Sequence, residues 1–116
     1  VQIDVEGALP QDARVAAAFL QIIREASTNA TKHAQAHQVH VRLWQEGTDA
    51  GAVAHMTISN DGSPAPVSYR EGTGIPGMRR VAQDLGGSLE VRPAPPFTLA
   101  VSIPLHSNAT VQRRSS

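Results

Sequence analysis

The chain has 116 residues, which is enough for one domain with a two-layer core. Ten basic residues balance ten acidic ones, so the charge excludes a basic surface for nucleic acid as the main function and fits a small-ligand site better. The chain has no cysteine and no apolar run of membrane-spanning length; this excludes disulfides and thiolate metal sites, indicates no direct membrane contact and fits a cytoplasmic location.

The first third of the chain predicts a strand followed by a long helix. Val1–Val5 alternates apolar and polar residues, as a half-buried strand does, and a start directly in a strand suggests a piece of a longer protein. Asp12 is of the type that caps a helix N-terminus. After it, apolar residues recur at spacings of three and four until about Ala34, which predicts a long amphipathic helix. The apolar stripe of this helix should pack on a sheet.

Two further strands are predicted next. Val39–Gln45 and Val53–Asn60 both alternate, and a turn-forming segment separates them. In the first of these strands Trp44 falls on the outer face, where we expect it to make surface contacts. In the second, Asn60 shares a face with apolar residues and should point towards the helices, so that Asp61 points away.

The segment 61–74 carries Gly, Ser and Pro without periodicity and predicts a loop, long for so small a domain. Loops of this length are commonly functional lids. A second helix is predicted over Ile75–Leu85, since Pro76 is tolerated in a first turn and the pair Gly86 and Gly87 ends the pattern.

The last third predicts strands at Ser88–Arg92 and Phe97–Ile103, with Phe97 pointing inward. Residues 106–116 have no apolar pattern and predict a flexible tail after a domain of residues 1–105. This order of elements indicates an α/β (α+β) fold: a two-layer sandwich in which helices cover one face of a five-stranded, mixed, mostly antiparallel sheet.

The long helix carries a row of polar residues. Glu25 and Asn29 are four residues apart, so they share one face, with His33 one turn further and Lys32 beside it. Such a row can be a merely solvated face. It can also offer ligands to Mg²⁺ and phosphate.

A second pattern is a glycine-rich loop that enters a helix. Gly72, Gly74 and Gly77 would leave backbone N–H groups and the positive end of the helix dipole available to phosphate oxygens. A plain turn explains the spacing as well. The pattern is neither the dinucleotide-binding glycine motif nor a P-loop.

Other polar residues give weaker indications. His33, His37 and His40 could form a metal cluster, but helix and strand geometry should separate them. Arg79 and Arg80 are either solvated or contact a neighbouring domain.

Three motifs in this order resemble the histidine-kinase ATPase domain of the GHKL superfamily. They are the N-box, EASTNATKHA from Glu25; the sequence Asn60, Asp61, Gly62; and GTGIPGM from Gly72. The resemblance covers about residues 1–105 and is nearest to sensor kinases that pair with response regulators of the NarL/LuxR type.

The resemblance implies the Bergerat ATP-binding fold, with ATP and Mg²⁺ as cofactors. It implies that Asn29 coordinates Mg²⁺, that Glu25 is the catalytic residue polarising a water or the attacking group, and that Lys32 and His33 lie near the phosphates. The ATP-binding residues that it implies are Asn29, Lys32, His33, Asn60, Gly62, Gly72, Thr73, Gly74, Ile75, Gly77 and Met78.

Two positions depart from the family pattern. Asn60 replaces the Asp that recognises adenine; its carbonyl could still accept a hydrogen bond from the adenine amino group, with a loss of about 1 kcal/mol. Phe97 follows Pro96 where many relatives have Gly followed by Ser or Thr. Both changes affect adenine affinity, not the phosphate site.

By resemblance, the full protein transfers the ATP γ-phosphate to a histidine on an upstream dimerisation hairpin, and then to a response-regulator aspartate. We expect the fragment to be monomeric, the full protein to be a homodimer, and the fragment alone not to autophosphorylate. The alternatives are a serine kinase of the same fold that acts on an anti-sigma antagonist, and a non-catalytic nucleotide-sensing or docking module.

Overall fold

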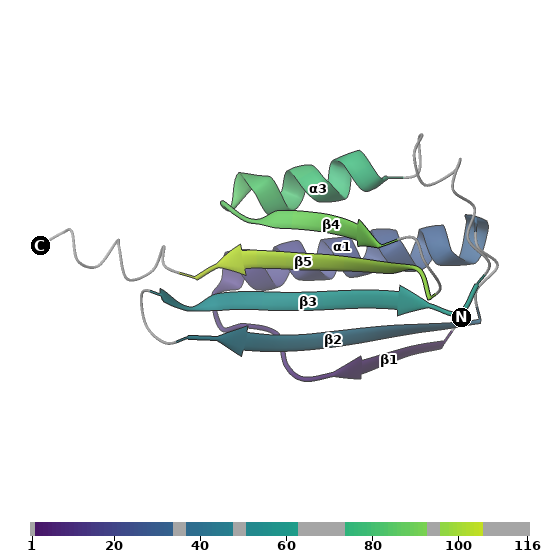
Figure 1. Ribbon diagram of the computed structural model, residues 1–116, viewed down its shortest axis with the longest axis horizontal. Coiled ribbons are helices and arrows are strands. Elements are labelled where there is room, and N and C mark those ends of the chain that lie inside the picture. Colours follow the sequence, from purple (N-terminus) through teal and green to yellow (C-terminus); the bar gives the residue numbers. More distant parts are fainter. Residues whose placement is uncertain (1, 34–36, 48–50, 63–73, 93–95, 106–116) are drawn as a thin grey trace, which may run out of the picture.

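The computed structural model describes residues 2–33, 37–47, 51–62, 74–92 and 96–105, without the side chains of residues 32 and 33. A five-stranded sheet forms one layer, and two helices cover one of its faces (Figure 1). The elements are β1 (Gln2–Glu6), α1 (Ala13–His33), β2 (Gln38–Glu46), β3 (Val53–Asn60), α3 (Ile75–Asp84), β4 (Ser88–Arg92) and β5 (Thr98–Pro104).

The strand order is β1-β2-β3-β5-β4. β1 pairs in parallel with β2, and the other three neighbouring pairs are antiparallel. The predicted mixed, mostly antiparallel sheet is therefore confirmed. Each predicted helix and strand begins and ends within two residues of the observed one. Val1, most of the predicted lid (63–73) and the predicted tail (106–116) lie outside the described residues.

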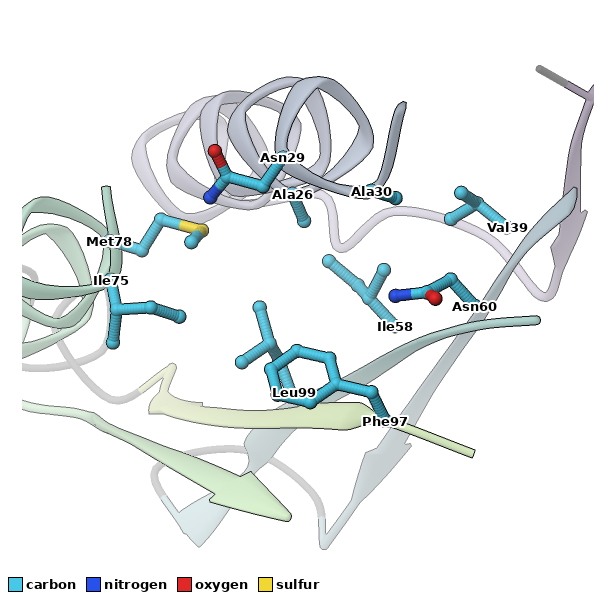
Figure 2. A pocket seen from close by; sticks show the side chains of 10 residues that line it. All are labelled: Ala26, Asn29, Ala30, Val39, Ile58, Asn60, Ile75, Met78, Phe97 and Leu99. Carbon is cyan, nitrogen blue, oxygen red and sulfur yellow. The ribbon is translucent and has the colours of Figure 1, made fainter. Parts of the chain in front are cut away.

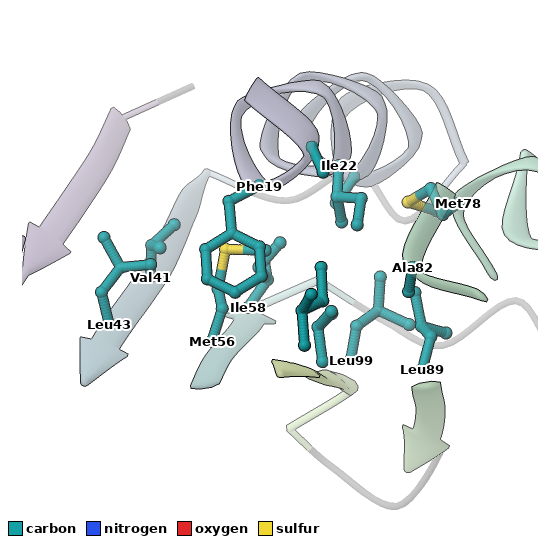
Figure 3. Packing of buried hydrophobic residues seen from close by; sticks show 14 of the residues in the cluster. Phe19, Ile22, Val41, Leu43, Met56, Ile58, Met78, Ala82, Leu89 and Leu99 are labelled. Atoms are coloured by element: carbon teal, nitrogen blue, oxygen red, sulfur yellow. The ribbon is translucent and has the colours of Figure 1, made fainter. Parts of the chain in front are cut away.

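The core lies between the two helices and the sheet, with Met78 and Ala82 of α3 among its residues. Phe19 and Ile22 of α1 are fully buried and point at strand residues that include Met56 and Leu99 (Figure 3). Asp12 caps α1, because its Oδ1 accepts hydrogen bonds from the backbone N–H groups of Arg14 (2.9 Å) and Val15 (3.3 Å). No described helix is both long and apolar enough to cross a membrane.

The prediction that β1 is half-buried is wrong. All five of its residues are exposed, including Ile3 (42% exposed) and Val5 (57%), although they pair with the buried residues Val39 and Val41 of β2. The physical reason is the position of the helices: α1 packs on β2 and β3, and α3 packs on β4 and β5. β1 lies at the sheet edge beyond α1. The alternating pattern therefore predicted the strand correctly, but not that neither α1 nor α3 packs on it.

The ends of α3 follow the predicted residues. Gly74 is the N-cap and Pro76 lies in the first turn. At the other end, the N–H of Gly86 donates to Gln83 O and the N–H of Gly87 donates to Ala82 O, both at 2.9 Å. These two bonds and the positive φ of Gly86 (81°) form a Schellman motif, which ends the helix and turns the chain into β4.

Trp44 lies on the outer face of the sheet, as predicted. Its ring stacks on His55 with centroids 5.2 Å apart, and the Arg42 guanidinium lies 5.4 Å from the Trp44 ring centroid. The Trp44–His55 stack joins β2 to β3 on the face opposite the helices, while Arg42 lies on the same strand as Trp44.

Asp61 connects the end of β3 to the start of β2. Its Oδ1 accepts hydrogen bonds from the backbone N–H groups of His37 (2.8 Å) and Gln38 (3.0 Å). The Gln38 bond, and after it the His37 bond, lower the pKa of Asp61, because both stabilise the carboxylate.

We predict that this connection is sensitive to acid. Because the pKa of Asp61 is lowered in the folded protein, its stabilisation is complete above the ordinary Asp value of about 4 and is lost as the pH falls through the lowered pKa. Asp61→Ala should lower the melting temperature most near neutral pH, and the difference from wild type should shrink below about pH 4. Asp84→Ala, which removes another exposed carboxylate, is the control. A difference of constant size between about pH 7 and about pH 2 would contradict the prediction.

Candidate functional site

A pocket lies between α1, the sheet and α3 (Figure 2). Its lining residues are apolar except for the amides of Asn29 and Asn60. The apolar lining residues are Ala26, Ala30, Val39, Ile58, Ile75, Met78, Phe97 and Leu99. The enclosed space is about 10 Å³, room for about one water molecule. A ligand with a ring must therefore move side chains apart as it enters.

Asn29 contributes a buried amide to this pocket. It is only 6% exposed and lies between Ala26 and Ala30 on the face of α1 that points at the sheet. The interpretation of the polar row as a merely solvated face is therefore wrong for Asn29. Glu25, one turn earlier, is exposed, so the predicted row divides into one buried and one accessible group.

Gly74 brings the start of α3 against this row. A Cβ atom on Gly74 would lie 2.8 Å from Glu25 Oε1 and 3.5 Å from Asn29 Nδ2, and the residue has a φ of 93°. Only glycine combines this approach with this backbone conformation at low cost. The N-terminal end of α3, the positive end of its helix dipole, is thereby held beside an acid and an amide.

A second hollow, of about 130 Å³, continues along the α1–α3 junction. Glu25 lies in its wall together with Gln21, and Gly77 and Val81 of α3 lie opposite. Gln21 was not among the predicted site residues. Its spacing of four from Glu25, on the same helix face, was the available signal.

Asn60 lies at the other end of the pocket, 8% exposed, and Asp61 points away as predicted. The Oδ1 atom of Asn60 accepts a hydrogen bond of 2.9 Å from the backbone N–H of Gly62. This differs from the expectation that the carbonyl is available to adenine. In the structure the carbonyl is occupied, and the amide nitrogen points towards the middle of the pocket (Figure 2).

Phe97 points into the pocket and is 4% exposed, as predicted. Thr98 is partly exposed, and its hydroxyl donates to the backbone oxygen of Pro96 (2.8 Å). Of the other predicted site residues, Ile75 and Met78 line the pocket and Gly77 lines the neighbouring hollow. Gly72, Thr73 and the side chains of Lys32 and His33 lie outside the described residues.

Comparison with known proteins identifies the family. Residues 15–107 match the histidine kinase-, DNA gyrase B-, and HSP90-like ATPase family. The chain is 33% identical over 100 residues to the signal transduction histidine-protein kinase/phosphatase UhpB of Salmonella typhimurium. The aligned region covers 85% of this chain but only 19% of UhpB.

Solved structures show the same fold. The histidine kinase domain of the blue-light activated histidine kinase of Erythrobacter litoralis EL346 aligns with a TM-score of 0.68 at 24% identity, over 95% of this chain and 54% of that one. The ATP binding domain of PrrB from Mycobacterium tuberculosis aligns with a TM-score of 0.65 at 20% identity, over 90% of this chain and 79% of that one.

The family match spans most of the chain, so the chain belongs to the histidine kinase-, DNA gyrase B-, and HSP90-like ATPases. Within this family it is of the kind that forms the ATP-binding catalytic domain of two-component sensor histidine kinases.

We predict that Gly74→Ala destabilises the domain. The new methyl group would displace the exposed Glu25 carboxylate, which can move at low cost, but the positive φ is unfavourable for alanine by about 1–2 kcal/mol. The free energy of unfolding in urea should fall by at least that amount. Gly77→Ala is the matched control, because a Cβ there meets no atom within 4 Å and alanine favours the helix. Equal stability of the two variants would contradict the prediction that Gly74 needs its positive φ.

Proposed function

We propose that this domain binds ATP with Mg²⁺ in the α1–α3 pocket and supplies the γ-phosphate for phosphorylation of a histidine. The observation that carries the proposal is the buried amide of Asn29 beside the exposed carboxylate of Glu25 and the glycine-held end of α3. Phosphoryl transfer needs mainly positioning and charge neutralisation, which such a site can supply.

Mg²⁺ fits this set of residues. The ion prefers oxygen ligands and keeps several waters and phosphate oxygens, so a single protein oxygen is sufficient anchorage. In the structure the Nδ2 atom of Asn29 is the amide atom nearer Gly74, so in our proposal the amide rotates to present its oxygen as that ligand. When bound, the ion would neutralise phosphate charge. Lys32 and His33 follow Asn29 on α1 and are proposed to lie near the phosphates.

Glu25 is the proposed catalytic residue. Its carboxylate faces the hollow that Gln21 and Gly77 also line, so an acceptor group can approach it without entering the apolar pocket. There it would polarise the attacking group. The backbone of Gly72, Thr73 and Gly74 and the start of α3 are proposed to bind the phosphates, and the apolar end near Phe97 and Asn60 would hold the base.

The partners belong to the whole protein and are proposals as well. We propose a histidine-bearing dimerisation hairpin in the same protein as acceptor, a NarL/LuxR-type response regulator as the next acceptor, and a cytoplasmic location. We further propose that residues 1–105 form the domain, monomeric alone and dimeric in the full protein. A non-catalytic nucleotide-sensing or docking module is the second candidate, favoured by the small enclosed volume and the inward Phe97.

Titration of the domain with Mg-ATP in a calorimeter tests the binding site. Wild type should bind, and Asn29→Ala should weaken binding at least about tenfold, the size of one charge-assisted contact, and remove its dependence on Mg²⁺. Thr28→Ala, at an exposed neighbour on α1, is the control. Unchanged binding by Asn29→Ala would refute the magnesium assignment, and no binding by wild type would favour the docking module.

Transfer of label from γ-³²P-ATP tests the chemistry. The isolated chain should incorporate no label, because none of its five histidines is the proposed acceptor. Added dimerisation hairpin from the full protein should become labelled. Glu25→Gln should slow that labelling by about a hundredfold or more while ATP affinity stays the same. Labelling of the isolated chain, or an undiminished rate in Glu25→Gln, would count against the proposal.

A further inference from the structure

The two ends of the pocket differ in chemistry. Asn29 lies at the end where α1 meets the start of α3, beside Glu25 and Gly74, which suits phosphates and a metal. Asn60 lies at the other end, where Phe97, Ile58 and Leu99 form apolar walls. An apolar slot with one polar group suits the flat ring of a base, because the walls contact its faces and the polar group contacts its edge.

The Gly62 bond fixes which atom of the Asn60 amide reaches that edge. A backbone N–H can only donate, so the group 2.9 Å from it must be the amide oxygen and not the nitrogen. The NH₂ group is therefore the one directed into the pocket, as Figure 2 shows. In the described part of the chain, the Asn60 side chain makes no hydrogen bond other than this one.

An NH₂ group donates hydrogen bonds, so it selects a base edge that accepts them. We propose that Asn60 gives this pocket relaxed purine specificity, so that nucleotides with an oxygen at position 6, such as inosine and guanosine triphosphates, bind about as tightly as ATP. The inference rests on the proposed function, since it concerns the base of the same nucleotide. It adds a class of nucleotide, the 6-oxopurines, to the ATP named there.

The reason lies in what each base offers. Hypoxanthine and guanine present a carbonyl oxygen at position 6, which accepts from the Asn60 NH₂ group. Adenine presents an amino group there, which can bond only if the amide rotates and gives up the Gly62 N–H; otherwise adenine must use its ring nitrogen N1. Adenine thus keeps one contact in either arrangement and is not rejected. An Asp in this position would be an acceptor only, and would favour adenine.

The apolar walls do not restore a preference. Phe97, Ile58 and Leu99 line the pocket and would contact a purine through its ring faces, which are alike in adenine and hypoxanthine. Inosine triphosphate is therefore the best probe, since its base differs from adenine only at position 6 and in the proton on N1.

The experiment measures Kd for Mg-ATP, Mg-ITP and Mg-GTP by calorimetry with the intact chain. In wild type, ATP and ITP should bind within about tenfold of each other, because at most one neutral hydrogen bond separates them. Asn60→Asp should shift the ratio about a hundredfold towards ATP, the size of a charge-assisted hydrogen bond. Ser59→Asp adds the same charge on the opposite face of β3 and should leave the ratio unchanged.

Asn60→Ala is the second variant, in case the buried aspartate prevents folding, which far-UV circular dichroism would reveal. It removes the amide that contacts either base and should weaken ITP binding about tenfold relative to wild type. A wild-type preference for ATP over ITP of more than about tenfold, a ratio unchanged in folded Asn60→Asp, or an ITP affinity unchanged in Asn60→Ala would overturn the inference while leaving ATP binding intact. No binding of any of the three nucleotides would instead overturn the proposed function, and the inference with it.

Discussion

The site depends on two buried amide side chains, Asn29 and Asn60, in a pocket whose other described lining residues are apolar. A buried amide without a hydrogen-bond partner costs about 1–3 kcal/mol, so each such group must be held in a definite orientation. Asn60 is held by the N–H of Gly62, two residues further along the same turn. The orientation of a single side chain therefore decides whether the apolar end of the pocket offers a donor or an acceptor.

The other end of the pocket depends on close approach of the two helices. Gly74 lets the start of α3 come against Glu25 and Asn29, which no residue with a Cβ could do without displacing the carboxylate. The two polar groups lie in different surroundings: Asn29 lines the enclosed pocket, whereas Glu25 faces the more open hollow towards Gln21. In the proposed function, the metal ligand and the catalytic group would thus act from one helix turn on different sides of a phosphate.

Most of the fold could be predicted from the sequence, because apolar residues recur clearly at every second position in the strands and at spacings of three and four in the helices. Alternation placed Asn60 and Phe97 inside correctly, since the helices do cover β3 and β5. The same rule failed for the burial of Ile3 and Val5, because burial depends on which strands the helices reach and alternation does not contain that information. The orientation of the Asn60 amide could not be predicted either, because it depends on the hydrogen bond from the Gly62 N–H in the following turn, which hydrophobic periodicity does not indicate.

β1 contributes little to the core, yet it occupies the edge of the sheet. The family match begins at residue 15 and leaves β1 out, so a chain shortened to that match would have β2 as its edge strand. β2 is nine residues long, and its unpaired backbone would lie beside Val39, Val41 and Leu43, a combination that invites self-association. β1 is shorter and carries Asp4 and Glu6, which oppose pairing of one sheet edge with another. This strand therefore protects the domain against aggregation.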